Sequence, residues 1–505
     1  MTKNNAIRII LVTALVIYLM PMHTWAQEDQ TIDEILNGFG DQETPEDDLQ
    51  DVLEGFEDKA EEDKKPAGSE EDEILKGFED EPEATDADTA DKHYLPPFLS
   101  LDGYFKLGAS YNLHGHEAAG TDTDYHGLSR LRTELQIELD TKFSESWQAR
   151  AAANSFYDFV YTMRGRGDYS DDVLDEYEKE FEFGEVWLLG SLTDHLDIKA
   201  GRQIVVWGKS DNIRITDVLN PLDLREPGLT DIENLRLPVT MTKLDYFFKG
   251  LNLSAMAIHE IRYDKNPEFG NDFFPFPQPL PSRKTPDEGF DLGDTEFAMA
   301  LNGIFRGWDA SFYWANIYDD APHLAVDSIL PVPTFKQDHA RLNMVGAAFN
   351  YAWGNWLFFT EAAYFDGIEF FNNPGKDYCQ IDALVGAEYS GYTNTTVSFE
   401  IADRHITNYD SNLKDAPDFI EEDTFISALR LTRTYWNDAL SLTLLAQTFG
   451  ITGDDGAFQR FSAEYDYTDS IEITGGIVFY KSGDLKRFRD VGDNDRVFLE
   501  IKYHF

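Results

Sequence analysis

The segment 131–143 alternates between two kinds of side chain at every step. Its odd positions hold leucine, isoleucine, threonine and phenylalanine, while its even positions hold arginine, glutamate, glutamine, aspartate and lysine. Successive side chains of a β-strand point to opposite faces, so this pattern predicts a strand with one apolar face and one ionic face. Strands of soluble sheets average about five or six residues, so a two-faced strand of this length is typical of a membrane barrel with a polar interior.

The same two-residue period recurs further along the chain. It is found in 105–111, 395–401, 461–467 and 471–479, and again in the last strand, 496–505. We expect the polar face to line the lumen of the barrel. The expected lumen-facing residues are Arg132, Glu134, Glu138, Arg496, Glu500 and Lys502. A chain that ends on an aromatic residue in such a strand resembles the C-terminal signal of bacterial outer-membrane barrels; a soluble β-sandwich is the alternative.

The spacing of the polar connections indicates the topology. Eight short turns alternate with nine longer polar loops along residues 95–505, which requires eighteen strands, or sixteen if one weak hairpin is merged. We therefore predict an all-β fold, a transmembrane antiparallel β-barrel in the bacterial outer membrane, with its short turns in the periplasm. A net charge of −52 excludes a nucleic-acid binder, which needs a basic face.

Residues 1–26 have the features of a secretory signal peptide. Lys3 and Arg8 provide a positive start, an apolar run follows, and a cleavage site precedes Gln27. A retained membrane anchor is the alternative. The next segment, 27–94, is acidic, since residues 28–93 contain 27 Asp and Glu against five Lys. This composition cannot bury enough apolar surface to offset chain entropy, so we expect a disordered tail in the periplasm.

The acidic tail contains a short motif three times. Each copy holds an acidic residue, a β-branched residue, Leu, a variable residue, Gly and Phe. In one helical turn the β-branched residue and the phenylalanine would form an apolar edge. We expect these edges to dock on a periplasmic or inner-membrane transporter partner, with an acidic spacer as the alternative. The expected partner-binding residues are Ile35, Leu36, Phe39, Val52, Leu53, Phe56, Ile74, Leu75 and Phe78.

Two of the longer loops are unusually apolar. Residues 210–238 contain several leucines that look buried. Because eighteen strands enclose a wide lumen, we expect this loop to fold inward and narrow it, with a position on the barrel rim as the alternative. Residues 273–281 consist mainly of phenylalanines and prolines. We expect them either to receive a hydrophobic substrate or lipid, or to pack on the barrel top.

A family resemblance rests on two neighbouring motifs. Residues 201–209 are Gly-Arg-Gln-Ile-Val-Val-Trp-Gly-Lys, and residues 220–225 are Asn-Pro-Leu-Asp-Leu-Arg. Together they resemble the signature of proteobacterial outer-membrane barrels that are catalogued as a domain of unknown function. The resemblance covers roughly residues 95–505, and a more distant similarity is to the alginate-export barrels. It implies an association with RND-superfamily permeases and a role in moving lipid-like or hydrophobic compounds across the envelope.

The role of Arg202, inside the first motif, stays open. Strict alternation would place it on the lipid face, whereas a bulge at Gly201 would turn it inward. The eleven histidines show no metal or triad spacing, so we expect no enzyme, no catalytic residues, no metal and no cofactor. The expected function is an outer-membrane channel component that docks an RND-type partner through its tail. A freestanding diffusion porin for small polar solutes is the alternative.

Overall fold

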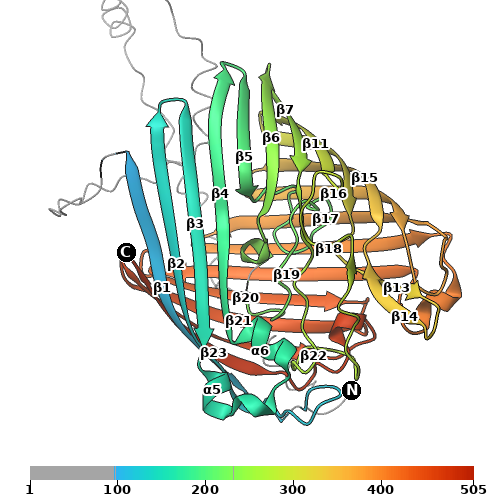
Figure 1. The fold of residues 1–505 in the computed structure, drawn as a ribbon. Coiled ribbons are helices and arrows are strands. Elements are labelled where there is room, and N and C mark those ends of the chain that lie inside the picture. The colour runs from blue at the N-terminus through green and yellow to red at the C-terminus, as the bar shows by residue number, and fades with distance from the viewer. Residues whose placement is uncertain (1–95, 97, 116, 231) are drawn as a thin grey trace, which may run out of the picture. The chain divides into compact units, whose positions relative to one another are not determined.

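A closed β-barrel makes up the described part of the chain. The computed structural model describes residues 96, 98–115, 117–230 and 232–505, so the expected signal peptide, acidic tail and repeats lie outside the described residues. Eighteen strands form one sheet, and each strand pairs antiparallel with its neighbour. The first strand, β1, also pairs with the last, β23, which closes the sheet (Figure 1). The predicted eighteen-stranded antiparallel barrel is confirmed.

The barrel strands follow one another around the wall in chain order. They are β1 (Leu99–Asn112), β2 (Gly127–Ser144), β3 (Trp147–Asp158), β4 (Lys179–Thr193), β5 (Leu196–Gln203), β6 (Val239–Phe248), β7 (Leu251–Ile258), β11 (Glu296–Phe305), β12 (Trp308–Tyr318), β15 (Arg341–Trp353), β16 (Trp356–Ile368), β17 (Tyr378–Tyr392), β18 (Thr395–Thr407), β19 (Asp423–Tyr435), β20 (Leu440–Phe449), β21 (Gly456–Thr468), β22 (Ile471–Lys481) and β23 (Arg496–His504).

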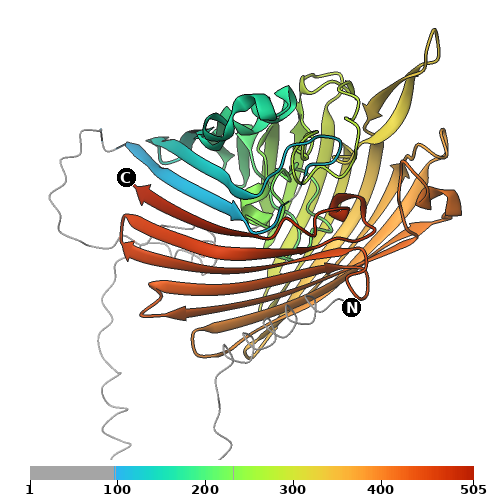
Figure 2. The same cartoon turned by 90° about the horizontal axis from the view of Figure 1, so that it is seen from below.

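The two ends of the barrel differ in their connections. At one end, the turn end, consecutive strands are joined by turns as short as 249–250, and the longest is 436–439. At the other, the loop end, the connections range from 450–455 to 259–295. The end of the chain lies at the turn end, where the Phe505 N–H donates a hydrogen bond to the Gly103 carbonyl at 3.0 Å. Short turns at one end and long loops at the other are typical of outer-membrane barrels (Figure 2).

The loop end carries small additional elements. They are the helices α5 (Val160–Arg164) and α6 (Asp171–Tyr177), the short strands β8 (Glu260–Ile261), β9 (Lys284–Thr285) and β10 (Gly289–Phe290), and the hairpin of β13 (His323–Ser328) and β14 (Thr334–Asp338). Single turns of 3-10 helix lie at Arg166–Asp168, Ile232–Leu235, Ser411–Lys414 and Lys486–Phe488. No helix among the described residues is long and apolar enough to cross a membrane.

The outer face of the barrel is apolar. Along β2, Leu135 and Ile137 are exposed on the outer face. Glu134, the residue before Leu135, points to the opposite face and forms an ion pair with Lys106 of β1 at 2.9 Å. Aromatic side chains are exposed around the turn end, including Trp308, Trp353, Trp356, Tyr392, Trp436, Tyr467 and Tyr503. Aromatic girdles of this kind mark the boundary between hydrocarbon and lipid headgroups, so the outer face is suited to lipid.

The outward face of β2 should therefore not accept a charge. We predict that Leu135→Arg impairs barrel assembly, because a cation facing hydrocarbon costs about 2–4 kcal/mol near the bilayer midplane. The neighbouring Gln136→Arg is the matched control, since Gln136 shares the inner face with Glu138, to which it donates a hydrogen bond. Heat-modifiable gel migration measures assembly. Equal defects in the two variants would contradict the assignment of the faces.

Candidate functional site

The connection between β5 and β6, residues 204–238, leaves the wall and crosses the lumen; we call it the inner loop. It begins at Ile204 because β5 ends at Gln203, six residues before the start expected from the sequence. Gly201 adopts a φ of 125°, and a Cβ at this position would lie 2.2 Å from the Val186 carbonyl oxygen. Only glycine fits this backbone conformation, two residues before β5 ends and the chain leaves the sheet.

A buried carboxylate on β16 holds the start of the inner loop. Glu361 is the sixth residue of its strand and only 2% exposed. It accepts hydrogen bonds from the backbone N–H groups of Lys209 at 2.6 Å and Ser210 at 2.9 Å. The backbone N–H and hydroxyl of Thr216 donate to its second oxygen at 3.1 and 2.7 Å. Because the carboxylate satisfies loop N–H groups that have left the sheet, it is an anchor in the middle of the wall.

A second carboxylate, two strands further along, extends this anchor. Glu400 on β18 accepts hydrogen bonds from the Ser210 hydroxyl at 2.6 Å and the Asn212 amide at 2.8 Å. Arg404 on the same strand donates to the Arg214 carbonyl at 3.1 Å. These contacts lie along the wall strands and not at their ends. The prediction that this loop folds inward is therefore confirmed, and the rim position is excluded.

A later part of the inner loop contacts β2 and β22, which lie beside the first and last strands of the barrel. Glu226 lies 3.2 Å from Arg130 and 3.5 Å from Arg132, both on β2. The Tyr480 hydroxyl on β22 donates to the Pro227 carbonyl at 2.6 Å. Burial alone would raise the pKa of Glu226, but Arg130 and Arg132 outweigh it and hold the pKa at about 2. This contact therefore remains ionised throughout the physiological pH range.

The second sequence motif, Asn220 to Arg225, ties the inner loop together. The Asn220 side chain accepts from the Val205 N–H at 2.8 Å and donates to the carbonyls of Gln203 at 3.2 Å and Leu237 at 2.9 Å. It thereby joins the two places where the chain leaves and rejoins the wall. Arg225 donates to the carboxylates of Asp223 at 2.6 Å and of Glu180 on β4 at 2.8 Å. The motif is thus a structural element of the loop.

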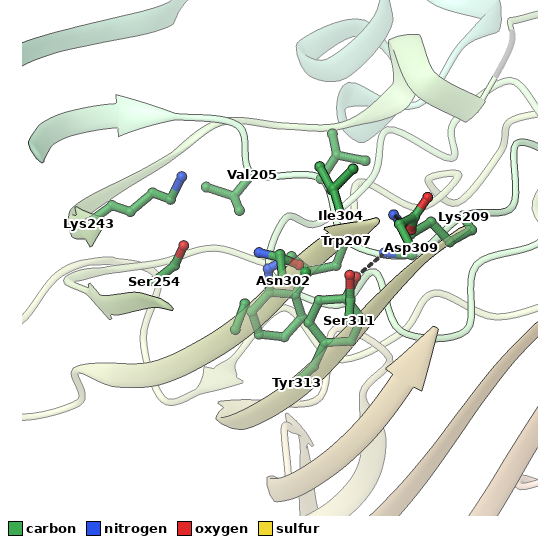
Figure 3. A pocket seen from close by; sticks show the side chains of 14 residues that line it. Val205, Trp207, Lys209, Lys243, Ser254, Asn302, Ile304, Asp309, Ser311 and Tyr313 are labelled. Carbon is green, nitrogen blue, oxygen red and sulfur yellow. Dashed lines mark hydrogen bonds and ion pairs between the residues drawn. The ribbon is translucent and has the colours of Figure 1, made fainter. Parts of the chain in front are cut away.

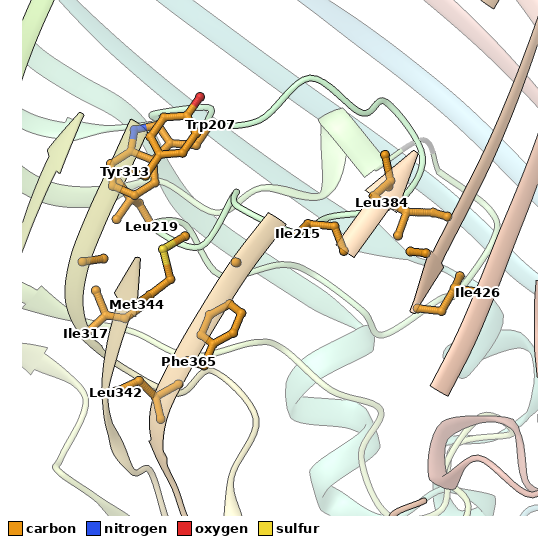
Figure 4. Close-up of a cluster of buried hydrophobic side chains, with 14 of the residues drawn as sticks. Trp207, Ile215, Leu219, Tyr313, Ile317, Leu342, Met344, Phe365, Leu384 and Ile426 are labelled. Carbon is orange, nitrogen blue, oxygen red and sulfur yellow. The ribbon is translucent and has the colours of Figure 1, made fainter. Parts of the chain in front are cut away.

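The lumen wall has an apolar half. Loop side chains pack against inward-facing apolar side chains of β12, β15, β16, β17 and β19 (Figure 4). The loop contributes Trp207, Ile213, Ile215 and Leu219, and the wall contributes Tyr313, Ile317, Leu342, Met344, Phe365, Leu384 and Ile426. Trp207 stacks on Tyr313 with ring centroids 4.7 Å apart. This packing removes apolar surface from water on one side of the lumen.

The other half of the wall is ionic. Arg130 forms an ion pair with Glu500 of β23 at 2.5 Å, and Lys502 with Glu472 of β22 at 3.1 Å. Glu138 lies 3.7 Å from Arg150 of β3. Together with the Lys106–Glu134 and Arg132–Glu226 pairs, these pairs include five of the expected lumen residues: Arg132, Glu134, Glu138, Glu500 and Lys502. Positive and negative groups alternate closely, so this half offers no surface of a single charge.

The remaining expected residue, Arg496, has a different partner. It is 3% exposed and forms an ion pair at 2.7 Å with Asp272 from the 259–295 loop. The same loop buries Phe273 and Phe274, and the Arg496 guanidinium lies 4.5 Å from the Phe273 ring centroid. Of the two alternatives for residues 273–281, the two phenylalanines therefore support packing inside the loop end.

Arg202 takes part in the wall network. Its guanidinium donates to the Pro238 carbonyl at 3.1 Å and forms ion pairs with Glu182 of β4 at 3.1 Å and Glu260 at 3.3 Å. Glu182 also forms an ion pair with the Lys265 ammonium at 2.9 Å. The backbone N–H of Lys265 donates a hydrogen bond to the Leu222 carbonyl of the inner loop. Arg202 therefore fixes the point where the inner loop rejoins the wall at β6.

The two loop anchors were not among the expected site residues. Glu361 interrupts an inward row of apolar residues, with Phe359 and Ala363 beside it, whereas Glu400 lies between Ser398 and Ala402 in a mixed row. A lone acidic residue on an otherwise apolar lumen face is the sequence signal that could have identified Glu361. Within the described ranges, no group of three His, Cys, Asp or Glu side chains is placed to hold a metal ion.

Comparison with known proteins gives one family and several distant structures. The model of the family described as "Protein of unknown function (DUF1302)" matches residues 119–505. OccAB2 of Acinetobacter baumannii is 11% identical with a TM-score of 0.48, over 81% of this chain and 98% of that one. The BenF-like porin of Pseudomonas fluorescens Pf-5 is 11% identical with a TM-score of 0.48, over 80% and 98%. The outer-membrane protein OpdK of Pseudomonas aeruginosa is 10% identical with a TM-score of 0.45, over 81% and 98%. No curated protein matches the sequence.

Removing the first anchor should free the inner loop. We predict that Glu361→Ala raises single-channel conductance in planar bilayers, because three backbone N–H groups lose a buried acceptor at about 1–3 kcal/mol each. Deleting residues 212–236 should raise conductance further. Glu138→Ala is the control, since Glu138 lies in the ionic half and pairs with Arg150. If correctly folded Glu361→Ala barrels conduct like the parent, the carboxylate does not hold the loop across the lumen.

Proposed function

The chain belongs to the DUF1302 family, and from this premise we propose that it is the outer-membrane channel of an envelope transport system for lipid-like or hydrophobic compounds. The single observation that carries the proposal is the inner loop. It crosses the lumen and is held by Glu361 and Glu400 against an apolar half of the wall. A passage that is narrowed by a fixed loop and bordered by apolar side chains favours apolar cargo over hydrated ions.

The acidic tail supports a role within a larger system. Its three motifs each offer Leu, Phe and a β-branched residue on a strongly acidic chain. Ordering such a segment consumes much of the binding free energy, so one motif binds weakly, while three copies bind an oligomeric partner more tightly. We propose that the tail extends into the periplasm and docks an RND-type permease, the partner class that the family resemblance implies.

A freestanding diffusion porin for small polar solutes is the alternative function. It is favoured by the ionic half of the wall, where paired charges such as Lys106 and Glu134 face the lumen. Liposome swelling separates the two functions. A diffusion porin admits arabinose rapidly as the unaltered protein, whereas the proposed channel admits it slowly until Glu361→Ala frees the inner loop.

The tail motifs provide the direct test of the proposed partner. We predict that the triple variant Phe39→Ala, Phe56→Ala and Phe78→Ala no longer retains an RND-superfamily permease after cross-linking and purification from native envelopes. Each single variant should lose only part of the retention, because the other two motifs remain tethered to the partner. Quantitative mass spectrometry of permease peptides measures retention.

Two controls accompany this measurement. Leu49→Ala removes an apolar tail residue outside the motifs and should leave retention unchanged. Heat-modifiable migration should show that all variants assemble the barrel. If the triple variant retains the permease fully and exports hydrophobic compounds as before, the motifs do not bind the partner. The tail would then be a spacer, and the diffusion porin would be favoured.

A further inference from the structure

A cavity of about 260 Å³ lies between the start of the inner loop and the wall strands β6, β7, β11 and β12 (Figure 3). Its lining extends from the middle of these strands toward the turn end, since Asp309 is the second residue of β12 and Ile304 is the last but one of β11. The floor is the stacked pair of Trp207 and Tyr313, and the Gly208 N–H donates to the Tyr313 hydroxyl at 3.3 Å. The inner loop therefore forms one side of this cavity.

The charges around the cavity neutralise one another in pairs. Lys209 of the inner loop lies 2.5 Å from Asp309, and Lys243 of β6 lies 3.0 Å from Asp245. Each lysine thus already has a carboxylate partner. A charged ligand would lose its hydration shell without gaining a free counter-ion, which disfavours both anions and cations.

Two aliphatic side chains in the lining of this cavity are exposed to solvent. Val206 is 58% exposed and Ile304 is 50% exposed, and both line the cavity. Asn302 and Ser311 also line it, on the strands that carry Ile304 and Asp309. The cavity therefore offers an apolar patch beside neutral hydrogen-bonding groups.

We propose that this cavity is a binding site for a neutral amphiphile, with its apolar part against Val206 and Ile304 and its hydroxyl or amide group toward Asn302 and Ser311. The inference rests on the proposed function and narrows its cargo to uncharged compounds with one polar end. The volume is adequate, because an apolar cavity of roughly 150 Å³ already holds benzene. A ligand here contacts Val206, three residues before Lys209, the first residue that Glu361 holds.

Photo-crosslinking in proteoliposomes tests the site with three probes of one chain length. They are decyl derivatives that carry an alkyl diazirine and end in a hydroxyl, a carboxylate or an ammonium group. We expect the alcohol to label Val206, Ile304 or Asn302 at least about tenfold more than either ion, a discrimination of the size that an unpaired buried charge imposes. Excess decanol should compete. Mass spectrometry maps the adducts. The adducts on lipid-facing residues measure how much of each probe enters the bilayer, and the labelling of the cavity is divided by this amount.

Charge variants make the test specific. Val206→Asp should abolish the alcohol adducts in the cavity while leaving adducts on the lipid face unchanged. Asp309→Asn leaves Lys209 without its carboxylate partner, so labelling should shift from the alcohol toward the carboxylate probe. Leu330→Asp, at the exposed tip between β13 and β14, is the control and should change neither. These shifts require a ligand in the cavity and would not arise from altered folding.

Two outcomes would overturn the inference. One is cavity labelling that is equal for the three probes, and the other is labelling that Val206→Asp does not change. Export of hydrophobic compounds by the same variants separates this failure from failure of the proposed function. If export is intact but the cavity is not labelled, the binding site is rejected and the proposed function stands. Specific cavity labelling in a protein that admits only polar solutes rejects the transport role while the site stands.

Discussion

The pairing of β1 with β23 is the contact on which the rest of the structure depends. A sheet in hydrocarbon cannot leave an edge unpaired, because nothing in the lipid satisfies its N–H and carbonyl groups. Closing eighteen strands removes both edges but encloses a lumen too wide for wall side chains to fill. The inner loop fills part of this space, and its own backbone groups then need partners. Glu361 and Glu400 provide them from the wall.

The two halves of the lumen wall hold the inner loop by different interactions. The apolar half, from β12 to β19, packs against Trp207, Ile215 and Leu219 of the loop. The ionic half binds the other end of the loop through Glu226. A loop that is packed on one side and ion-paired on the other has one preferred position. The lumen wall therefore differs around its circumference, with an apolar side and an ionic side that each bind a different part of the loop.

The strands could be predicted because lipid imposes one apolar face along their whole length, as in β2 and β23. The inward course of the inner loop followed from its leucines and the width of the lumen. Its start at Ile204 could not be predicted, since Val205, Val206 and Trp207 have the composition of a strand that would continue β5. Three of the four hydrogen bonds that Glu361 accepts also left no signal, because their donors are backbone N–H groups, which every residue except proline carries.

Arg130 links three distant parts of the chain, and this has a consequence for biogenesis. It contacts Glu226 of the inner loop and Glu500 of the last strand, which is 370 residues further along the chain. Contacts between residues so far apart form late, because the intervening chain must first be ordered. Glu226 is 96 residues from Arg130 in the chain, so we expect its contact to form before that of Glu500. One guanidinium therefore couples the position of the inner loop to the closure of the barrel.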